Sequence, residues 1–372
     1  MRIVFFHSSA SVYGSDRSLL TIVAGLRAKG HIVTVVLPES GPLQERLASA
    51  GVPTLVRPLA VIHRTASPRF WLVFLWRCAL MVAGSDLRSL DADLVYSNTS
   101  HVWSGALFAL RYRIRHFWHL REMERVSPAL LRIIGRALVQ TSAMVICVSR
   151  SVAVHYSLDR YSQKVCVLHN GLERDWSRDA HTPPEELRLL YVGRITPYKG
   201  LHILLEALLL VDIPVTLRIV GAAKTPADLG YQESLRSMQT RLASNHQVEW
   251  IGEADLTRSH YDWCRCLVQP NVSPEPFGRV TIEAMARRRA VIASSIGGSA
   301  EIVVDGVSGL LCSPGSVEDL AKAITAVVGR GDLASKFGAA GEKRFELMYS
   351  SDVLVENVSR LLEEHMNKGI QE

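Results

Sequence analysis

The sequence predicts an α/β protein made of two parallel-sheet, Rossmann-like domains that face a central cleft. The chain has 372 residues, which is more than one hydrophobic core usually holds. Short apolar runs rich in β-branched residues alternate with helix-length segments, the pattern of βαβ units. This alternation stops once, at a polar stretch from 172 to 186, and then begins again. Two Rossmann-like halves in series follow from these observations.

The first half begins with a complete βαβ pattern. Residues 2–6 are an apolar run, a segment with helical apolar spacing ends at Gly30, and residues 32–38 are rich in valine. Strand, helix and strand in this order predict a parallel pair. We assign residues 1–172 to the first domain. Further apolar runs continue its sheet at 93–98, 115–122 and 143–149.

The second half repeats the alternation, and we assign residues 186–350 to a second domain. The stretch before it carries Pro183 and Pro184 and shows no apolar period, as expected of a boundary. Residues 351–372 contain an amphipathic helical pattern, which requires a surface to pack against. Its apolar side chains are Val353, Leu354, Val358, Leu361 and Leu362.

The composition excludes several classes of protein. With 48% hydrophobic and 21% charged residues, the chain is typical of a soluble globular protein and not of a disordered or fibrous one. The six cysteines show neither CxxC nor Cys/His ligand spacing, so neither a disulfide framework nor a zinc site is expected. The first residues have the pattern of a strand and not of a signal peptide. A reducing, cytoplasmic compartment is therefore expected.

The positive charge is concentrated in the first half of the chain. Residues 1–180 hold 22 Lys and Arg against 12 Asp and Glu, whereas residues 181–372 hold 20 against 24. Such a field attracts nucleic acid or an anionic membrane surface, although a scattered basic surface without a partner fits equally well.

The most apolar stretch, residues 70–84, is shorter than the roughly 20 residues that span a bilayer. It also contains Arg77, so it predicts a helix that is buried or lies at an interface. Residues 69–77 and 111–121 mix arginine with aromatic residues, which is typical of membrane-interface contacts and also of nucleic-acid binders. In the second stretch, Phe117 and Trp118 fit a core position equally well.

Three loops have the sequence of anion sites at the carboxyl ends of strands, where ligands bind in open α/β sheets. In the first, Gly14 precedes the first helix and would let an anion approach the backbone, although a glycine there is also an ordinary turn residue. In the second, Arg194 and Lys199 follow a buried strand. Two cations at a strand end suit a diphosphate leaving group, and a solvated pair is the alternative.

The third loop is "SPEPFGRVTIEAMA", residues 273–286. Two prolines exclude helix before Phe277, and Gly278 then frees the backbone to begin one. The first N–H groups of that helix, near Arg279 and Val280, are donors for an anion.

Two acids flank this turn. Glu275 lies in the loop, and Glu283 lies one turn inside the expected helix. Their spacing could bring both carboxylates toward one ligand, the first on the hydroxyls of a sugar and the second on a ribose. The alternatives are an acid that is favourable at a helix start and an exposed helix residue.

The stretch E-P-F-G-R-V-T-I-E resembles the Glu-x7-Glu motif of glycosyltransferase family 4, retaining enzymes of the two-Rossmann GT-B architecture. Further stretches support the resemblance over nearly the whole chain, and their order and spacing make it specific. They are YGSDRSLL, AKGHIVTVV, VLHNGLE, YVGRITPYKG and IGGSAEIVVDGVSGLLCSPGSVEDLAKAI.

The resemblance implies a nucleotide-sugar donor held mainly by the second domain. Arg194 and Lys199 would neutralise the diphosphate. Glu275 would hold donor-sugar hydroxyls, and Glu283 would hold the ribose. The backbone of Phe277, Gly278, Arg279 and Val280 would contact the sugar and the phosphate.

In the first domain, the resemblance implies that His119 is the active-site histidine near the reacting carbon, with Arg121 and Glu122 as its supports. Gly14 would approach the phosphate or the sugar. The last helix would cross back to the first domain. No cofactor is implied, because the nucleotide sugar is a substrate.

Two departures from the family's pattern and one rival motif bear on the site. Residues 221–230 replace the family's frequent glycine-rich turn, and Glu173 stands where another acid often follows the Asn-Gly pair. Asp91 and Asp93 have the DxD form of a metal-binding motif. They precede their strand and so lie at the wrong end of the sheet for a ligand. No other cluster offers metal ligands, so we expect no metal.

The expected function is a metal-independent, retaining hexosyltransferase that moves a sugar from a UDP- or GDP-sugar to a hydroxyl of a glycan or glycolipid, in cell-surface polysaccharide or lipopolysaccharide biosynthesis. The alternatives are a nucleotide-sugar epimerase of GT-B fold and a non-catalytic GT-B binding or scaffold protein. A dehydrogenase is disfavoured, since neither half has GxGxxG followed by an acid. We expect a cytoplasmic protein, peripheral on the inner face of the cell membrane, that binds its donor, a glycan or lipid-linked acceptor and an anionic membrane surface, and no nucleic acid.

Overall fold

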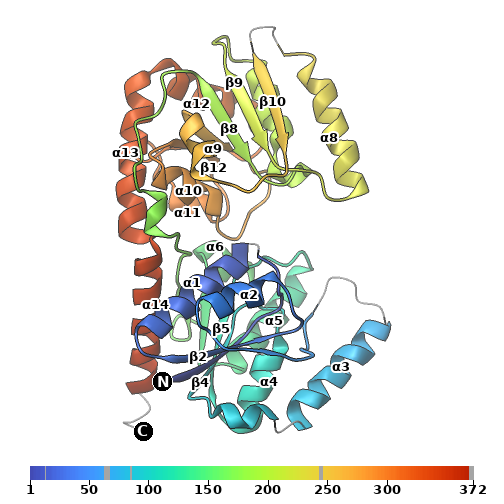
Figure 1. Ribbon diagram of the computed structural model, residues 1–372. Helices are drawn as coiled ribbons and strands as arrows, with labels where there is room; N and C mark the ends of the chain where they lie inside the picture. The colour runs from blue at the N-terminus through green and yellow to red at the C-terminus, as the bar shows by residue number, and fades with distance from the viewer. Residues whose placement is uncertain (13, 63–67, 84–85, 243–245, 368–372) are drawn as a thin grey trace. The chain divides into compact units, whose positions relative to one another are not determined.

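The computed structural model describes the chain except for residues 13, 63–67, 84–85, 243–245 and 368–372. It divides the chain into two compact units (Figure 1). Unit 1 consists of Met1–Gly171 together with Ser351–Glu372, and unit 2 consists of Leu172–Ser350. The polar stretch that follows residue 172 therefore belongs to unit 2.

Within the described residues, unit 1 contains a seven-stranded sheet in the order β3-β2-β1-β4-β5-β6-β7. Every pairing in it is parallel. Its strands are β1 (Arg2–Phe6), β2 (Ile32–Leu37), β3 (Thr54–Val56), β4 (Leu94–Ser97), β5 (Arg115–Leu120), β6 (Met144–Cys147) and β7 (Val165–Val167). Its helices are α1 (Gly14–Ala28), α2 (Pro42–Ser49), α3 (Pro68–Ala83), α4 (Trp103–Tyr112), α5 (Pro128–Gln140), α6 (Arg150–His155) and α14 (Ser351–Asn367), with a short 3-10 helix at Asp86–Leu90.

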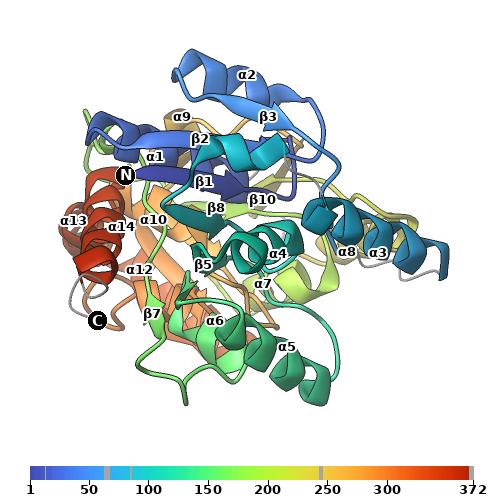
Figure 2. The ribbon, with the colours of Figure 1, turned by 90° about the horizontal axis from the view of Figure 1, so that it is seen from below.

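Successive residues of β1 enter different cores, because side chains alternate across a sheet. Ile3 and Phe5 belong to the core beneath α1, α2 and α14, whereas Val4 and Phe6 belong to the core beneath α3 and α4. Figure 2 shows α1 beside α14 and α3 beside α4. These four residues are buried, so β1 contributes side chains to both cores of the unit.

The final helix completes the first of these cores. Leu354, Val358 and Leu362 of α14 are buried in it. A Cβ atom built on Gly25 of α1 would lie 2.3 Å from Cγ2 of Val355, so the helices touch where α1 lacks a side chain. The amphipathic pattern of residues 351–367 is thus explained by packing on unit 1.

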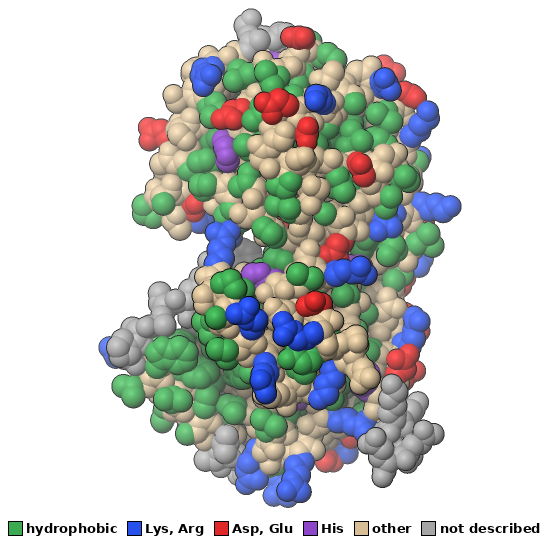
Figure 3. Space-filling view, turned by 180° about the vertical axis from the view of Figure 1, so that it is seen from behind, with side chains coloured by type: hydrophobic (Ala, Val, Ile, Leu, Met, Phe, Trp, Pro, Cys, Tyr) green, Lys and Arg blue, Asp and Glu red, His purple; other side chains and the backbone are tan. Residues whose placement is uncertain are grey.

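Helix α3 lies at the surface of unit 1. Met81 is buried in the core shared with α4, while much of the helix faces solvent with apolar side chains, which gather at the lower left of Figure 3. Among the described residues, no helix combines the length and the hydropathy needed to cross a membrane.

Unit 2, as far as it is described, contains a six-stranded parallel sheet in the order β10-β9-β8-β11-β12-β13. Its strands are β8 (Arg188–Val192), β9 (Thr216–Val220), β10 (Gln247–Gly252), β11 (Cys266–Gln269), β12 (Ala290–Ser294) and β13 (Leu310–Cys312). Its helices are α7 (Leu201–Leu208), α8 (Pro226–Gln239), α9 (Arg258–Trp263), α10 (Arg279–Ala286), α11 (Ser299–Ile302), α12 (Val317–Gly329) and α13 (Gly331–Met348), with 3-10 helices at Arg174–Trp176 and Pro197–Lys199.

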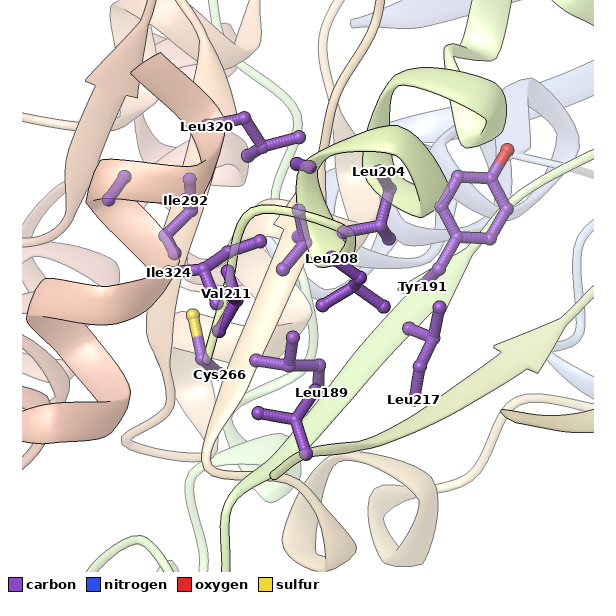
Figure 4. Packing of buried hydrophobic residues seen from close by; sticks show 14 of the residues in the cluster. Leu189, Tyr191, Leu204, Leu208, Val211, Leu217, Cys266, Ile292, Leu320 and Ile324 are labelled. Carbon is purple, nitrogen blue, oxygen red and sulfur yellow. The ribbon is translucent and has the colours of Figure 1, made fainter. Parts of the chain in front are cut away.

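The core of unit 2 packs α7 and α12 on β8, β9, β11 and β12 (Figure 4). Tyr191 of β8 places its ring in this core, and its hydroxyl donates to the carbonyl oxygen of Arg194 at 3.1 Å. Ser316 caps the N-terminus of α12, because its hydroxyl accepts from the N–H of Asp319 at 3.1 Å. The hydrogen bond of Tyr191 thus connects this core to the loop that follows β8.

Candidate active site

The second-domain residues expected to bind a ligand lie at one edge of the sheet of unit 2. The loop after β8 carries Arg194 and Lys199, and the loop after β11 carries Glu275. Because β8 and β11 are neighbours in the sheet, their carboxyl ends bring these loops together although 76 positions separate Lys199 from Glu275. The sheet order therefore assembles the site.

Lys199, Glu275 and Ser299 form its centre. The Lys199 Nζ donates to Oε2 of Glu275 at 2.5 Å, and the Ser299 hydroxyl donates to Oε1 at 2.8 Å. The side chains of Lys199 and Glu275 are 16% and 12% exposed. Burial alone would raise the pKa of Glu275, but the Lys199 charge and hydrogen bonds from Lys199, Ser299 and Asn271 hold this pKa below its usual value. Glu275 is therefore a carboxylate at neutral pH.

Glycines make this cluster possible, because the backbone of the loop after β12 packs directly on the backbone of the loop after β11. A Cβ on Gly297, which has a φ of +67°, would lie 2.6 Å from the Glu275 nitrogen. A Cβ on Gly298 would lie 2.2 Å from the Phe277 carbonyl oxygen. The N–H of Gly298 donates to the Glu275 carbonyl at 2.9 Å. Any larger residue would push the loop that carries Glu275 away.

Gly278 has a left-handed φ of +99° and caps α10 at its N-terminus. A Cβ on it would lie 2.3 Å from the Ser299 hydroxyl. The sequence correctly placed a turn into a helix here. Phe277 is buried and packs edge-on against Tyr349, whereas Val280 is half-buried.

Arg194 is exposed, unlike Lys199. Its guanidinium donates to the Tyr198 hydroxyl. Gly200 ends this loop with a φ of +70°, and a Cβ there would lie 1.8 Å from the Pro270 carbonyl oxygen. The loops after β8 and β11 are thus in direct contact.

Glu283 is buried inside α10, with a side chain only 2% exposed, so it is not the exposed helix residue that the sequence left as an alternative. Its Oε2 accepts from the Tyr261 hydroxyl at 2.5 Å, and its Oε1 accepts from Arg279 Nε at 2.9 Å. Burial, and then the Glu283 charge, raise the pKa of Tyr261 well above its usual value, so the phenol remains a donor. Arg279 thereby contributes a side chain to the site, whereas the sequence pointed only to its backbone.

In unit 1, His119 lies within β5 and is fully buried. Its Nδ1 accepts from the Tyr96 hydroxyl at 2.7 Å and from Arg121 at 3.1 Å. An arginine only donates, so a neutral imidazole here carries its proton on Nε2. Burial, and then the Arg121 charge, lower the pKa of His119 well below its usual value. The Nε2 atom is buried without a hydrogen-bond partner among the described residues.

Arg121 connects this histidine to the neighbouring strand ends. Its Nε donates to Asn98 Oδ1 at 2.9 Å, and its Nη1 donates to Asn170. Glu122 accepts from the Ser100 hydroxyl at 2.6 Å and from the Arg121 N–H at 3.0 Å. Both residues therefore hold the carboxyl edge of the sheet together.

The sequence reasoning missed a buried group beside them. His7 Nε2 lies 2.7 Å from Asp16 Oδ1, and Asn98 Nδ2 lies 3.2 Å from His7 Nδ1. His7 follows β1, Asn98 follows β4 and Asp16 lies in the first turn of α1. The rule that ligand sites lie at strand carboxyl ends could have singled out the polar residues that directly follow these two strands.

Gly14 begins α1 near this group, and a Cβ built on it would have no described atom within 4 Å. The local packing therefore does not require a glycine at this position.

Asp91 and Asp93 lie at the amino end of β4. Asp91 pairs with the Arg2 guanidinium at 2.6 Å, and Asp93 accepts from the Arg2 N–H at 2.7 Å. Both carboxylates thus have a structural role. In the described part of the chain, no three His, Cys, Asp or Glu side chains cluster as metal ligands would.

Comparison with known proteins agrees with this architecture. The family model described as Glycosyl transferase 4-like domain matches residues 14–171, and that described as Glycosyl transferases group 1 matches residues 173–344. Alpha-maltose-1-phosphate synthase of Mycobacterium tuberculosis is 31% identical over 313 residues, which are 70% of this chain and 79% of the relative. O-antigen chain mannosyltransferase C of Escherichia coli is 29% identical over 231 residues, which are 59% of this chain and 60% of the relative.

Among solved structures, HepE from Anabaena in complex with UDP superposes with a TM-score of 0.82 at 23% identity, covering 98% of this chain and 100% of HepE. The fold and these matches define a glycosyltransferase of GT-B architecture. The chain belongs to the family 4-like glycosyltransferases, with a glycosyl transferase 4-like domain followed by a glycosyl transferases group 1 domain. The predicted family and the predicted pair of Rossmann-like domains are confirmed.

Proposed function

We propose that the protein is a retaining, metal-independent hexosyltransferase that takes its sugar from a UDP- or GDP-sugar and transfers it to a hydroxyl of a glycan or glycolipid. The cluster of Lys199, Glu275 and Ser299 at the carboxyl edge of the sheet of unit 2 carries the proposal. It places a cation, Lys199, beside a carboxylate, Glu275, where the loops after β8 and β11 meet. Each group can form further hydrogen bonds with a ligand.

The capacity follows from counting donors and acceptors. An ammonium group has three N–H donors, and a carboxylate has about four acceptor sites. Lys199 directs one donor to Glu275, so two remain for diphosphate oxygens. Glu275 accepts from three side chains, which leaves acceptor capacity for a hydroxyl of the donor sugar. The exposed Arg194 would add a second positive charge.

In the proposed reaction, the bond between the anomeric carbon and the diphosphate oxygen breaks while the acceptor oxygen bonds to the same carbon. The acceptor proton passes to a phosphate oxygen, and the acceptor attacks from the face that the diphosphate leaves. Lys199 and Arg194 would stabilise the charge that grows on the diphosphate. Neutral His119 would donate through Nε2–H to the sugar, and Gly14 would allow the donor to approach α1.

The relatives support a nucleotide-sugar donor. The structures of HepE contain UDP, UDP with glucose, or UDP-glucose. The mannosyltransferase of Escherichia coli is described as acting on the O-antigen chain, which supports a role in cell-surface polysaccharide or lipopolysaccharide synthesis. We also propose that the protein lies in the cytoplasm, because its cysteines show no disulfide framework, and peripherally on the inner face of the membrane, because the first half of the chain is basic.

The donor can be identified by thermal unfolding in the presence of UDP- and GDP-sugars, since a ligand that binds only the native state raises its stability. The stabilising sugar is then incubated with glycan and lipid-linked acceptors, with and without EDTA. The mass of the product separates transfer from epimerisation, and the anomeric configuration of the new bond tests retention.

Glu275→Ala tests the site itself. We expect a folded protein whose transfer is reduced at least ~100-fold, the loss typical of a transition-state contact. Glu233→Ala, on the exposed side of α8, is the matched control and should keep full activity. Near-normal turnover of Glu275→Ala would refute the assignment of the donor site.

A further inference from the structure

Helix α3 is apolar on both of its sides. Phe70, Phe74, Cys78 and Met81 recur at helical spacing and are half-buried or buried, so they form the side that packs on unit 1. The helix contacts α4, and the Arg77 guanidinium donates to the Leu59 carbonyl oxygen at 3.1 Å. The inward side of the helix is thus accounted for.

The outward side carries large apolar side chains where a surface helix normally carries polar ones. Figure 3 shows apolar side chains gathered over this part of unit 1. The exposed fractions are 43% for Trp71, 70% for Leu72, 40% for Val73, 61% for Leu75, 57% for Trp76 and 44% for Leu80. Contiguous apolar surface of this kind marks an interaction site.

The charges around α3 indicate what covers this surface. Residues 46–85 contain five arginines and no acidic residue, and α4, which contacts α3, carries Arg111 and no acidic residue. Arg57, Arg69 and Arg111 are exposed. A second copy of the chain would bring the same positive charge to the interface and be repelled, whereas an anionic surface would be attracted.

The composition of the outward side points to lipid. Tryptophan and leucine on a helix flanked by arginine are typical of helices that lie in the membrane interface. The helix has 16 residues, which at 1.5 Å per residue reach about 24 Å, less than the roughly 30 Å hydrocarbon core of a bilayer. It is therefore suited to lie in the interface plane.

We propose that α3 docks the protein on the surface of an anionic lipid bilayer. Trp71, Leu72, Leu75 and Trp76 enter the boundary between headgroups and acyl chains, and the neighbouring arginines contact lipid phosphates. This surface belongs to unit 1 and does not depend on the donor site of unit 2.

The test is co-sedimentation of the full chain with vesicles of phosphatidylcholine alone and of phosphatidylcholine mixed with phosphatidylglycerol. We expect binding to the mixed vesicles that weakens as salt is added. The variant Trp71→Ser/Leu72→Ser/Trp76→Ser should bind these vesicles at least ~10-fold more weakly, because each side chain loses its apolar transfer energy.

The matched control is Leu229→Ser/Leu347→Ser. These leucines are 58% and 66% exposed on α8 and α13 of unit 2, so the control removes similar exposed apolar groups elsewhere. It should bind vesicles like the parent chain. Thermal unfolding checks that both variants are folded, and stabilisation by UDP- or GDP-sugars, measured on both, separates a failure of this proposal from a failure of the donor site.

A second measurement locates the helix. Brominated phosphatidylcholine in the mixed vesicles quenches tryptophans that enter the bilayer. We expect quenching in the parent chain, and its loss in Trp71→Phe/Trp76→Phe, which should still bind. Equal vesicle binding by the serine variant and its control would overturn the proposal. The proposal would also be overturned if the parent chain self-associates without lipid, as measured by analytical ultracentrifugation, and the serine variant does not. A second copy of the chain would then cover α3.

Discussion

The Nζ of Lys199 lies 2.5 Å from Oε2 of Glu275, so the cation proposed to neutralise the diphosphate is held by the acid proposed to bind the sugar. The two side chains are therefore oriented by each other within the protein. A substitution of either residue leaves the charge of the other without its partner. The resulting coupling energy between the two residues can be measured.

Lys199→Met should destabilise the protein by about 2 kcal/mol, less than loss of a fully buried pair costs, because both groups retain some contact with water. Glu275→Gln should cost less, because the amide oxygen still accepts from Ser299. The double variant should be more stable than the sum of the two effects predicts, while remaining inactive. Urea unfolding of the four proteins in a double-mutant cycle checks this, and strict additivity would contradict a direct interaction.

Gly14→Ala should separate ligand contact from stability. Because an added Cβ meets no described atom within 4 Å, the melting temperature should stay the same or rise slightly, as alanine is the better helix former. Donor transfer should nevertheless fall at least ~10-fold if the donor passes close to this position. Gly230→Ala in α8, also without an atom within 4 Å, is the control and should leave activity unchanged.

Gly298→Ala, unlike Gly14→Ala, should lower the stability of the fold. The new methyl group would lie 2.2 Å from the Phe277 carbonyl oxygen, so the loop that carries Glu275 must move. We expect a loss of roughly 2 kcal/mol in unfolding free energy, typical of overpacking, together with loss of donor binding. Chemical unfolding and thermal shift with the donor measure both effects, and an unchanged donor affinity would show that the loop position is unimportant.

His116 should make the stability depend on pH. Its ring is buried, with Nε2 at 2.9 Å from the Ser97 hydroxyl and Nδ1 at 2.9 Å from the Thr141 carbonyl oxygen. Burial lowers its pKa to about 4, while an unfolded histidine titrates near 6.5. Below pH about 6.5 the unfolded state gains a proton that the native state does not, so up to about 3 kcal/mol of stability is present at neutral pH and is lost progressively toward pH 4.

Urea unfolding between pH 7 and pH 4 measures this slope. Burial acts on His119 in the same direction, so His116→Gln should flatten the slope without abolishing it. A slope identical in the variant and the parent would show that folding does not lower the pKa of His116.

The sequence predicted the alternation of strands and helices and the carboxyl-edge positions of Lys199 and Glu275, because apolar period and turn residues are local properties. It could not predict the pairing of these two side chains, which depends on β8 and β11 being neighbours. Ser299 escaped notice for the same reason, since its contact with Glu275 requires two distant glycine-rich loops to meet.

The sequence also left the role of residues 70–84 open between a buried and an interfacial helix. A helix with large apolar side chains on both sides has no polar side to identify the surface that faces solvent. The structure distinguishes the buried side of α3 from its exposed side, because Met81 is buried in the core and Trp76 is exposed. Similarly, a strand position could be expected for His119, but the tautomer depends on Tyr96 and Arg121, which only the folded sheet brings to its Nδ1.

The packing of α14 on α1 has a consequence for biosynthesis. Leu354, Val358 and Leu362 complete a core whose other members are synthesised before residue 171. The ribosome must therefore produce all of unit 2 before unit 1 can close that core, and unit 2 has the chance to fold first. Until then the side of α1 that packs on α14 stays open to water, and exposed apolar surface of this kind makes an incomplete unit 1 prone to aggregation.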